Sequence, residues 1–246
     1  MERERITKKA GIVAAVGAAL AAYVLLLRPW HLRWGATSAE CGERLPGDDL
    51  VPYPKSEATH AITIDAPLDE VWPWLVQVGQ TRGGFYSYTW LENLVGCHMQ
   101  NAESIVPEWQ SMKEGDEVWL HPKAPPLPVI IFEPYQAIVL GSPDQQETDS
   151  IASASGTWGF FLKRVDDKTT RLLARNRWDR KPGLLNWLGS YVLLEPAHFV
   201  MERKMMLGIK SRAERAARVV FKGVNDRDSL STNLTARTET GPGPQR

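Results

Sequence analysis

The sequence contains little cysteine, since Cys41 and Cys97 are the only two in 246 residues. Neither stands in a CxxC pair or at the Cys/His spacing of zinc ligands, so a structural zinc site is not indicated. A disulfide bond between them is an open alternative for a domain outside the cytoplasm, although a domain of this size can fold without one. We expect neither a metal nor another cofactor.

The chain also lacks net charge, because 29 Lys and Arg residues balance 29 Asp and Glu residues. Proteins that bind nucleic acids carry a basic excess, so we do not expect a nucleic acid as partner. The GxSxG motif of a nucleophilic serine and the glycine-rich phosphate loop are absent as well. These absences leave binding or acid–base chemistry on a small molecule as the function classes to consider.

A long apolar run is present near the N-terminus. Residues 10–27 read AGIVAAVGAALAAYVLLL, which is 18 residues without a charge. An apolar helix of about 20 residues spans the hydrocarbon layer of a membrane. Trp30 and Trp34 follow it, as in an aromatic belt at the interface. The alternative, a cleaved signal peptide, usually has an apolar region of about 7–15 residues. We therefore expect a single-pass anchor in the lipid bilayer of the cell membrane.

The orientation of this anchor follows from the basic residues on its two sides. Four of them precede the span, and three follow it up to residue 44 (Arg3, Arg5, Lys8 and Lys9; Arg28, Arg33 and Arg44). The positive-inside rule then places the N-terminus in the cytoplasm, by a small margin. The folded domain is expected on the extracytoplasmic side.

Four segments divide the chain. Residues 1–34 are expected to form the anchor with its flanks, and residues 35–59, rich in Gly, Pro, Asp and Ser, a linker. Residues 60–222 carry regular apolar patterns and are expected to form the folded domain. Residues 223–246 are polar and are expected to be a disordered tail.

The patterns within 60–222 predict an α+β domain. A strand is predicted at 60–67 and two helices at 68–79 and 86–96. Strands follow at 116–122, 127–134 and 136–142, then a hairpin over 156–178. Residues 196–221 predict a long amphipathic helix, with Pro196 at its first position.

This order resembles the helix-grip fold of the START-like, or SRPBCC, superfamily. The segment ITIDAPLDEVWPWLVQVGQTRGGFYSYTWLENL is similar to the opening strand and paired helices of bacterial members, and TWGFFLKRVDDKTTRLLARNR to their last hairpin. LEPAHFVMERKMMLGIKSRAE is similar to the closing helix of a membrane-anchored subgroup. The superfamily includes polyketide cyclases and coenzyme Q-binding START proteins. The resemblance implies a curved antiparallel sheet wrapped on the C-terminal helix, with an apolar cavity between them.

Aromatic residues gather after the most flexible point of the chain. Gly83 and Gly84 are expected to form a gating loop at the cavity mouth. The rings expected to bind an apolar ligand are Phe85, Tyr86, Tyr88, Trp90, Trp109 and Trp119. Each of these six rings could instead lie in the packed core. For three other residues, Trp72, Leu75 and Trp158, we favour a place in the core.

Candidates for catalysis are fewer. His98, Glu92 and Glu103 cluster in sequence and could transfer protons beside an apolar cavity, but a surface or capping role is favoured. His31, His121 and His198 stand alone in the sequence, so no metal site is indicated. In the strand around Leu172, Ala174 and Asn176, alternation directs these three inward and Arg175 and Arg177 to solvent.

Three functions follow as hypotheses. The first is a membrane-anchored protein that binds or transfers an apolar or amphipathic small molecule, such as a lipid, isoprenoid or quinone. The second is an enzyme of the cyclase or dehydrase kind that uses acid–base residues in the same cavity. The third is an interaction protein whose cavity has collapsed. We favour the first and expect no enzymatic activity.

Overall fold

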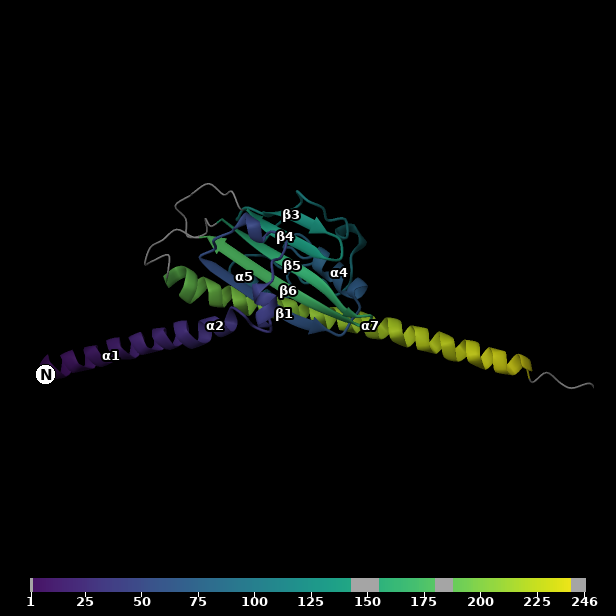
Figure 1. The fold of residues 1–246 in the computed structure, drawn as a ribbon, viewed down its shortest axis with the longest axis horizontal. Coiled ribbons are helices and arrows are strands. Elements are labelled where there is room, and N and C mark those ends of the chain that lie inside the picture. The colour runs from purple at the N-terminus through teal and green to yellow at the C-terminus, as the bar shows by residue number, and fades with distance from the viewer. Residues whose placement is uncertain (1, 143–154, 180–187, 240–246) are drawn as a thin grey trace, which may run out of the picture.

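The computed structural model describes residues 2–142, 155–179 and 188–239. A six-stranded antiparallel sheet dominates the domain, in the order β1-β6-β5-β4-β3-β2. The chain leaves the sheet through helix α7 (Glu195–Glu239), which crosses one face (Figure 1). The strands are β1 (Ser56–Ile64), β2 (Glu117–Val118), β3 (Leu127–Glu133), β4 (Ala137–Ser142), β5 (Ser155–Asp166) and β6 (Thr169–Asp179).

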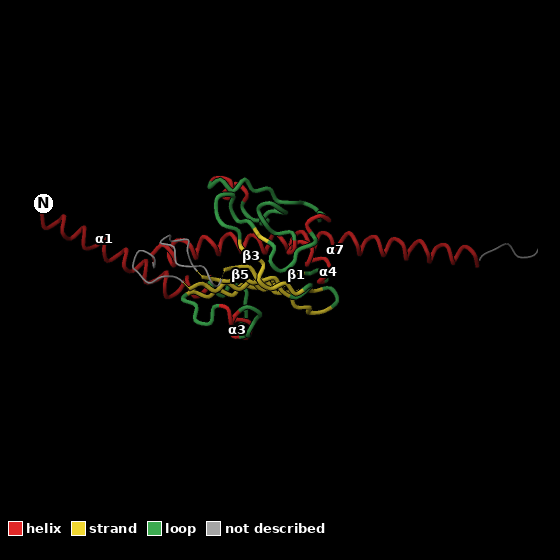
Figure 2. The backbone as a smooth tube through the Cα atoms, turned by 90° about the horizontal axis from the view of Figure 1, so that it is seen from above, coloured by secondary structure: helices red, strands yellow, loops and turns green. Residues whose placement is uncertain are grey.

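Helices lie on both faces of this sheet. Helices α4 (Leu68–Val76) and α7 lie on one face, and α3 (Ser38–Gly42) lies on the other (Figure 2). We call the face toward α7 the inner face and the opposite one the outer face. The remaining helical segments are α1 (Glu2–Ala22), η1 (Tyr23–Leu27), α2 (Arg28–His31), η2 (Asp48–Leu50), α5 (Thr89–Leu94), η3 (Pro107–Trp109) and η4 (Leu188–Leu194).

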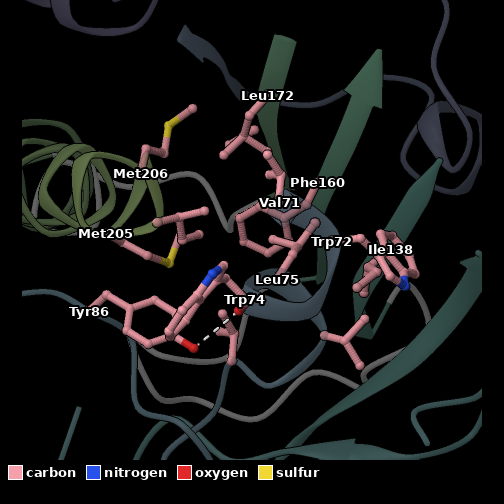
Figure 3. Packing of buried hydrophobic residues seen from close by; sticks show 14 of the residues in the cluster. Val71, Trp72, Trp74, Leu75, Tyr86, Ile138, Phe160, Leu172, Met205 and Met206 are labelled. Carbon is pink, nitrogen blue, oxygen red and sulfur yellow. Dashed lines mark hydrogen bonds between the residues drawn. The ribbon is translucent and has the colours of Figure 1, made fainter. Parts of the chain in front are cut away.

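The core lies between the inner face and α7. Helix α7 contributes buried residues at helical spacing, and the strands contribute every second residue (Met205, Met206, Ile209, Ala213 and Ala217; Ile62, Ile64, Phe160, Leu162, Leu172 and Ala174). Figure 3 shows Met205 and Met206 facing Leu172, Phe160 and the α4 residues. A sheet wrapped on one long C-terminal helix, with an apolar N-terminal helix, confirms the expected α+β helix-grip fold.

The alternation of strand β6 between the two faces is confirmed, but the solvent exposure expected for its two arginines is not. Leu172, Ala174 and Asn176 are buried on the inner face. Arg175 and Arg177 were expected in solvent, and this was wrong. They lie on the outer face but beneath residues 36–51, and Arg175 is only 3% exposed. Its guanidinium donates to Asp48 (2.7 Å) and to the Glu43 carbonyl (2.7 Å).

These contacts also change the place of residues 35–59, which the sequence predicted as a linker. Leu45 packs with Val139, Phe161 and Leu173 in a second small core on the outer face. Thr37 and Glu40 form a capping box at the start of α3. The segment is rich in turn-forming residues, and this composition predicted a linker. In the structure, buried apolar residues such as Leu45 and buried ion pairs attach the segment to the sheet. Strand β1 accordingly begins at Ser56, not at residue 60.

The two ends of the chain project from the domain in opposite directions (Figure 1). Residues Thr7–His31 form one continuous helical stretch that is long and apolar enough to cross a membrane. Within this stretch only His31, at its end, is buried. At the other end, α7 continues to Glu239, into the segment expected to be disordered. The last part of that tail, residues 240–246, lies outside the described residues.

Candidate functional site

A cavity of about 560 Å³ lies between helix α5, the inner face and the first turns of α7. We call it the main cavity. Its walls are mostly apolar, with Leu91, Val95, Met99, Leu120, Leu127 and Met205 among the lining residues. Small-molecule sites commonly have volumes of about 300–1,000 Å³, so the main cavity is large enough for a ligand.

Trp158 on β5 forms the centre of one wall. Its ring stacks on Phe85 with the centroids 6.1 Å apart, lies 4.8 Å from Phe160, and meets His198 edge-on at 5.5 Å. Trp158 is buried, as expected of a core residue, but it also lines the main cavity. The same ring therefore serves both packing and the ligand wall.

A buried polar cluster lies behind this wall and is built around Glu202 of α7. Its carboxylate pairs with Nδ1 of His60 and accepts from the Trp158 indole N–H. It also accepts from the Asn176 amide at 2.9 Å, while Nε2 of His198 lies 3.5 Å away. Nε2 of His60 donates to the His31 carbonyl at 2.8 Å. Because a carbonyl only accepts, Nε2 of His60 carries the proton of that hydrogen bond, and Nδ1 faces the carboxylate of Glu202.

The environment of Glu202 explains its ionisation. Burial acts to raise the pKa of this carboxyl, because a charged group loses its hydration. The charge of His60 and the contacts with His198 and His60 outweigh that effect, so the pKa lies well below its usual range. The cluster thus holds a carboxylate inside the protein without leaving an unpaired charge.

A second cavity of about 340 Å³ adjoins the first, and we call it the anchor-side cavity. The two share Trp178, Leu194, Ala197, His198 and Met201 as lining residues. The anchor-side cavity is also lined by His31 and Leu32, at the end of the apolar N-terminal helix. Arg28 fixes this junction by a two-pronged ion pair with Glu195, at 2.8 and 3.0 Å.

Of the six rings expected to bind a ligand, only Phe85 lines the main cavity. Tyr86 belongs to the core instead: it is 2% exposed, its hydroxyl donates to the Trp74 carbonyl at 3.1 Å, and Figure 3 shows it beside Trp74 and Met205. Tyr88 lies half-buried under Lys204 of α7, with the ammonium 5.7 Å from the ring centre.

The other three rings are also placed away from the two cavities. Trp90 is 69% exposed on α5. Trp109 and Trp119 are half-buried, and their backbone carbonyls accept hydrogen bonds from the Arg82 guanidinium and the Gln80 amide, respectively. Neither is among the residues that line the main or the anchor-side cavity.

Gly83 and Gly84, the expected gating loop, form a tightly packed turn. Gly84 has φ +75° and pairs with Gly79. A Cβ at Gly84 would lie 2.4 Å from the Asn101 side chain and 2.6 Å from the Gln100 carbonyl. At Gly83 it would lie 2.8 Å from the Gln77 carbonyl. The two glycines thus permit a close approach of the backbone that a side chain would prevent.

The three acid–base candidates do not come together. Glu92 lines the main cavity and is buried, and desolvation raises the pKa of its carboxyl. His98 is exposed, with φ +51°. Glu103 is exposed and pairs with Arg212. Glu92 alone is therefore placed to meet a ligand in the main cavity.

Sequence reasoning missed the cluster of His60, His198 and Glu202. A signal was present, because residues 198 and 202 are four apart and continue into the apolar stripe of Met206 and Ile209. Polar residues at core-facing helix positions mark a buried polar site. His60 similarly occupies the inward face of β1 with Ile62 and Ile64. In the described part of the chain, no three His, Cys, Asp or Glu side chains are arranged to hold a metal ion, and both cysteines are free.

No family model matches the chain, and no curated protein matches it. Solved structures do resemble it. One is a protein from Thermobifida fusca, with TM-score 0.41 and 11% identity over 65% of this chain and 93% of that chain. A second is an aromatase/cyclase from a Streptomyces species (TM-score 0.35, 14% identity, 65% and 94% covered). A third is a polyketide-cyclase-like protein from Corynebacterium glutamicum (0.30, 13%, 68% and 93%). Similarity at this level gives no conclusion about what this chain binds or does.

Proposed function

We propose that this chain is a membrane-anchored protein that binds or transfers an apolar or amphipathic small molecule in its helix-grip cavity. A lipid, an isoprenoid or a quinone fits this description. The main cavity carries the proposal, because about 560 Å³ of mostly apolar space adjoins a cavity that reaches the end of the N-terminal helix. A ligand that partitions into the bilayer would meet the anchor-side cavity first, because this cavity lies at the end of the N-terminal helix.

The energetics are sufficient for binding without chemistry. Apolar surface removed from water contributes roughly 25 cal/mol per Å². An acyl or isoprenoid chain that buries a few hundred Å² would gain several kcal/mol before ordering costs, which is on the order of micromolar affinity. Binding of this kind needs no catalytic group.

The surface next to the opening supports a place at the membrane. Segment η4 carries three apolar side chains that are partly exposed, Val192 at 37%, Leu193 at 66% and Leu194 at 37%. Leu194 also lines both cavities. Apolar side chains that remain exposed at a cavity mouth are favourable where a lipid surface covers them.

Occlusion of the shared wall tests the proposal. Ala197 lines both cavities, so Ala197→Phe should fill the passage between them. Val200→Phe, on the same helix, is exposed and lines neither cavity, which makes it the matched control. Detergent-extracted full-length chains would be titrated with a long-chain quinone, and tryptophan quenching would be measured. We expect saturable quenching in wild type and Val200→Phe, and loss of it in Ala197→Phe. Equal quenching in all three would contradict binding in the cavity, and no saturable quenching in wild type would contradict binding altogether.

An enzyme of the cyclase or dehydrase kind is the second candidate. Three titratable side chains of the main cavity favour it, namely Glu92, His198 and Glu202. An enzyme would convert the bound small molecule to a product. Loss of this turnover in Glu92→Gln or His198→Gln, with quinone binding unchanged, would support the enzyme over the binding protein. The third hypothesis, an interaction protein with a collapsed cavity, conflicts with the cavity volume.

A further inference from the structure

Glu92 is an unusual buried side chain. It lies on α5, is 6% exposed, and lines the main cavity. Its Oε2 atom is out of contact with solvent and has no hydrogen-bond partner within the described residues. Buried polar atoms almost always have a partner, because leaving one unpaired costs the full desolvation of the group. A carboxyl in this position therefore suits a ligand that supplies the missing partner.

The rest of the lining restricts what that partner can be. No lysine or arginine is among the described residues that line either cavity. The other carboxylate of the main cavity, Glu202, is already paired with His60 and hydrogen-bonded to Trp158 and Asn176. Among the described residues that line the main cavity, His198 is the only basic side chain, and its Nε2 atom lies 3.5 Å from the carboxylate of Glu202, which would offset a positive charge there.

A negatively charged ligand head would thus be buried beside two carboxyl groups, with no lysine or arginine among the described lining residues to pair with it. Burial of an unpaired charge costs far more than burial of a neutral polar group. A neutral hydroxyl or carbonyl oxygen avoids this cost and can still hydrogen-bond to the Glu92 carboxyl. Desolvation raises the pKa of the Glu92 carboxyl, which favours its protonated form. A protonated carboxyl can donate as well as accept a hydrogen bond, so this effect also favours a neutral oxygen group on the ligand.

We propose that Glu92 selects the ligand of the main cavity, by hydrogen-bonding the neutral hydroxyl or carbonyl group of an otherwise apolar molecule. The cavity then takes long-chain alcohols or ketones in preference to fatty acids and other anionic lipids. This inference rests on the proposed binding function and names the chemical class of its ligand. Glu92 makes this selection by touching the ligand, while the Glu202 cluster maintains the wall opposite.

A competition experiment on the detergent-extracted full-length chain tests the selection. Nile red, a neutral apolar dye, would be bound first and then displaced by decane, 1-decanol, decanoate or decylamine. One hydrogen bond to a buried carboxyl corresponds to about tenfold in affinity. We expect 1-decanol to displace the dye at about tenfold lower concentration than decane, and decanoate to be the weakest competitor.

Three variants assign this preference to one side chain. Glu92→Gln retains a hydrogen-bonding group and should keep the preference for 1-decanol over decane. Glu92→Leu should abolish it while decane still competes, and Glu92→Met serves the same purpose if the leucine variant fails to fold. Glu103→Leu, which changes an exposed carboxylate outside the cavity, should behave as wild type.

The contrary results are separable. A preference for decanoate would mean that His198 receives an anion, and a preference for decylamine would mean that Glu92 receives a cation; either overturns the inference. A preference for 1-decanol that survives both Glu92→Leu and Glu92→Met overturns it as well. If Nile red and all four competitors fail to bind the wild-type chain, the proposed function fails together with the inference.

Discussion

The imidazole of His60 on β1 pairs with the carboxylate of Glu202 on α7 inside the protein, where the two side chains are 1% and 0% exposed. The pair connects the first strand of the sheet to the helix that the sheet grips. It also orients the groups behind the cavity wall, since the other oxygen of Glu202 accepts from Trp158 and Asn176. The fold and the candidate site therefore depend on the same contact.

The first prediction concerns this pair. Glu202→Gln keeps the size of the side chain and an oxygen that accepts from Trp158 and Asn176, but it removes the carboxylate that pairs with His60. Removal of one partner of a buried ion pair typically costs about 3–5 kcal/mol. We expect a decrease of this order in the free energy of unfolding, measured by urea denaturation of the detergent-extracted chain.

Glu103→Gln is the matched control for that measurement. Glu103 also pairs with a basic residue, Arg212, but its side chain is 67% exposed. Exposed ion pairs contribute about 0–1 kcal/mol. Equal and small effects of the two substitutions would contradict a structural role for the buried pair.

Sequence patterns could predict the architecture because they record where apolar side chains repeat. The alternation around Leu172 and Ala174 and the helical spacing of Met205, Met206 and Ile209 identified the inner face and the gripping helix. Both patterns come from burial against one continuous core, which a single sequence expresses directly.

The candidate site was harder to predict, because its residues are defined by three-dimensional proximity. His60 and Glu202 are 142 positions apart and meet only when β1 and α7 pack together. The aromatic-rich segment after Gly84 could not be assigned from the sequence for a related reason. Ring density alone does not distinguish Phe85, which lines the cavity, from Tyr86, which packs in the core. The outer-face contacts of Arg175 depend likewise on a distant, turn-rich segment.

The second prediction concerns the turn at Gly84. Gly84→Ala combines a positive φ with a Cβ that would lie 2.6 Å from the Gln100 carbonyl. Gly115→Ala is the matched control, because Gly115 has a similar φ of +86° but open space around it. The strain of a positive φ alone costs about 1–2 kcal/mol. Thermal unfolding should show that Gly84→Ala is clearly more destabilising than Gly115→Ala. If the two substitutions lowered the stability equally, the backbone around Gly84 could shift to accept a Cβ without further cost.

The third prediction concerns the attachment of residues 36–51 to the outer face. Hydrogen bonds from Arg171 lower the pKa of Glu40 to about 2, against burial, with help from Thr37. A carboxyl whose pKa is lower in the folded state stabilises the fold above its unfolded pKa, near 4.5. That contribution is lost as the pH falls from about 4.5 towards about 2.

Glu40→Gln should therefore be less stable than wild type at neutral pH, and the difference should shrink as the pH falls through this window. Glu108→Gln, which changes an exposed carboxylate on η3, should show little effect at any pH. The measurement is the unfolding free energy at a series of pH values. A Glu40→Gln deficit that stays constant down to pH about 2 would disagree with the lowered pKa.

The fourth prediction is that the domain lies on the extracytoplasmic side of the membrane. It rests on the excess of basic residues before the apolar segment. Asp167 in the β5–β6 turn is 99% exposed, so Asp167→Cys presents a thiol without disturbing packing. We expect a membrane-impermeant maleimide to label this variant in intact cells. Wild type is the control, since Cys97 is buried and Cys41 is half-buried. Labelling only after lysis would show that the domain lies on the cytoplasmic side.

The last prediction is that the N-terminal helix holds the protein in the bilayer. Val13 and Val16 are 71% and 62% exposed, and the whole stretch Thr7–His31 is long and apolar enough to span. A lysine near the centre of a spanning helix costs about 2.5–3.5 kcal/mol. Full-length wild-type protein should remain in the membrane pellet after carbonate washing. The double variant Val13→Lys, Val16→Lys should be released into the supernatant. The matched control carries the same two substitutions on the domain, at Val165 and Val219, which are also exposed, and should stay in the pellet. Release of wild type, or retention of the N-terminal double variant, would show that residues 7–31 do not act as the anchor.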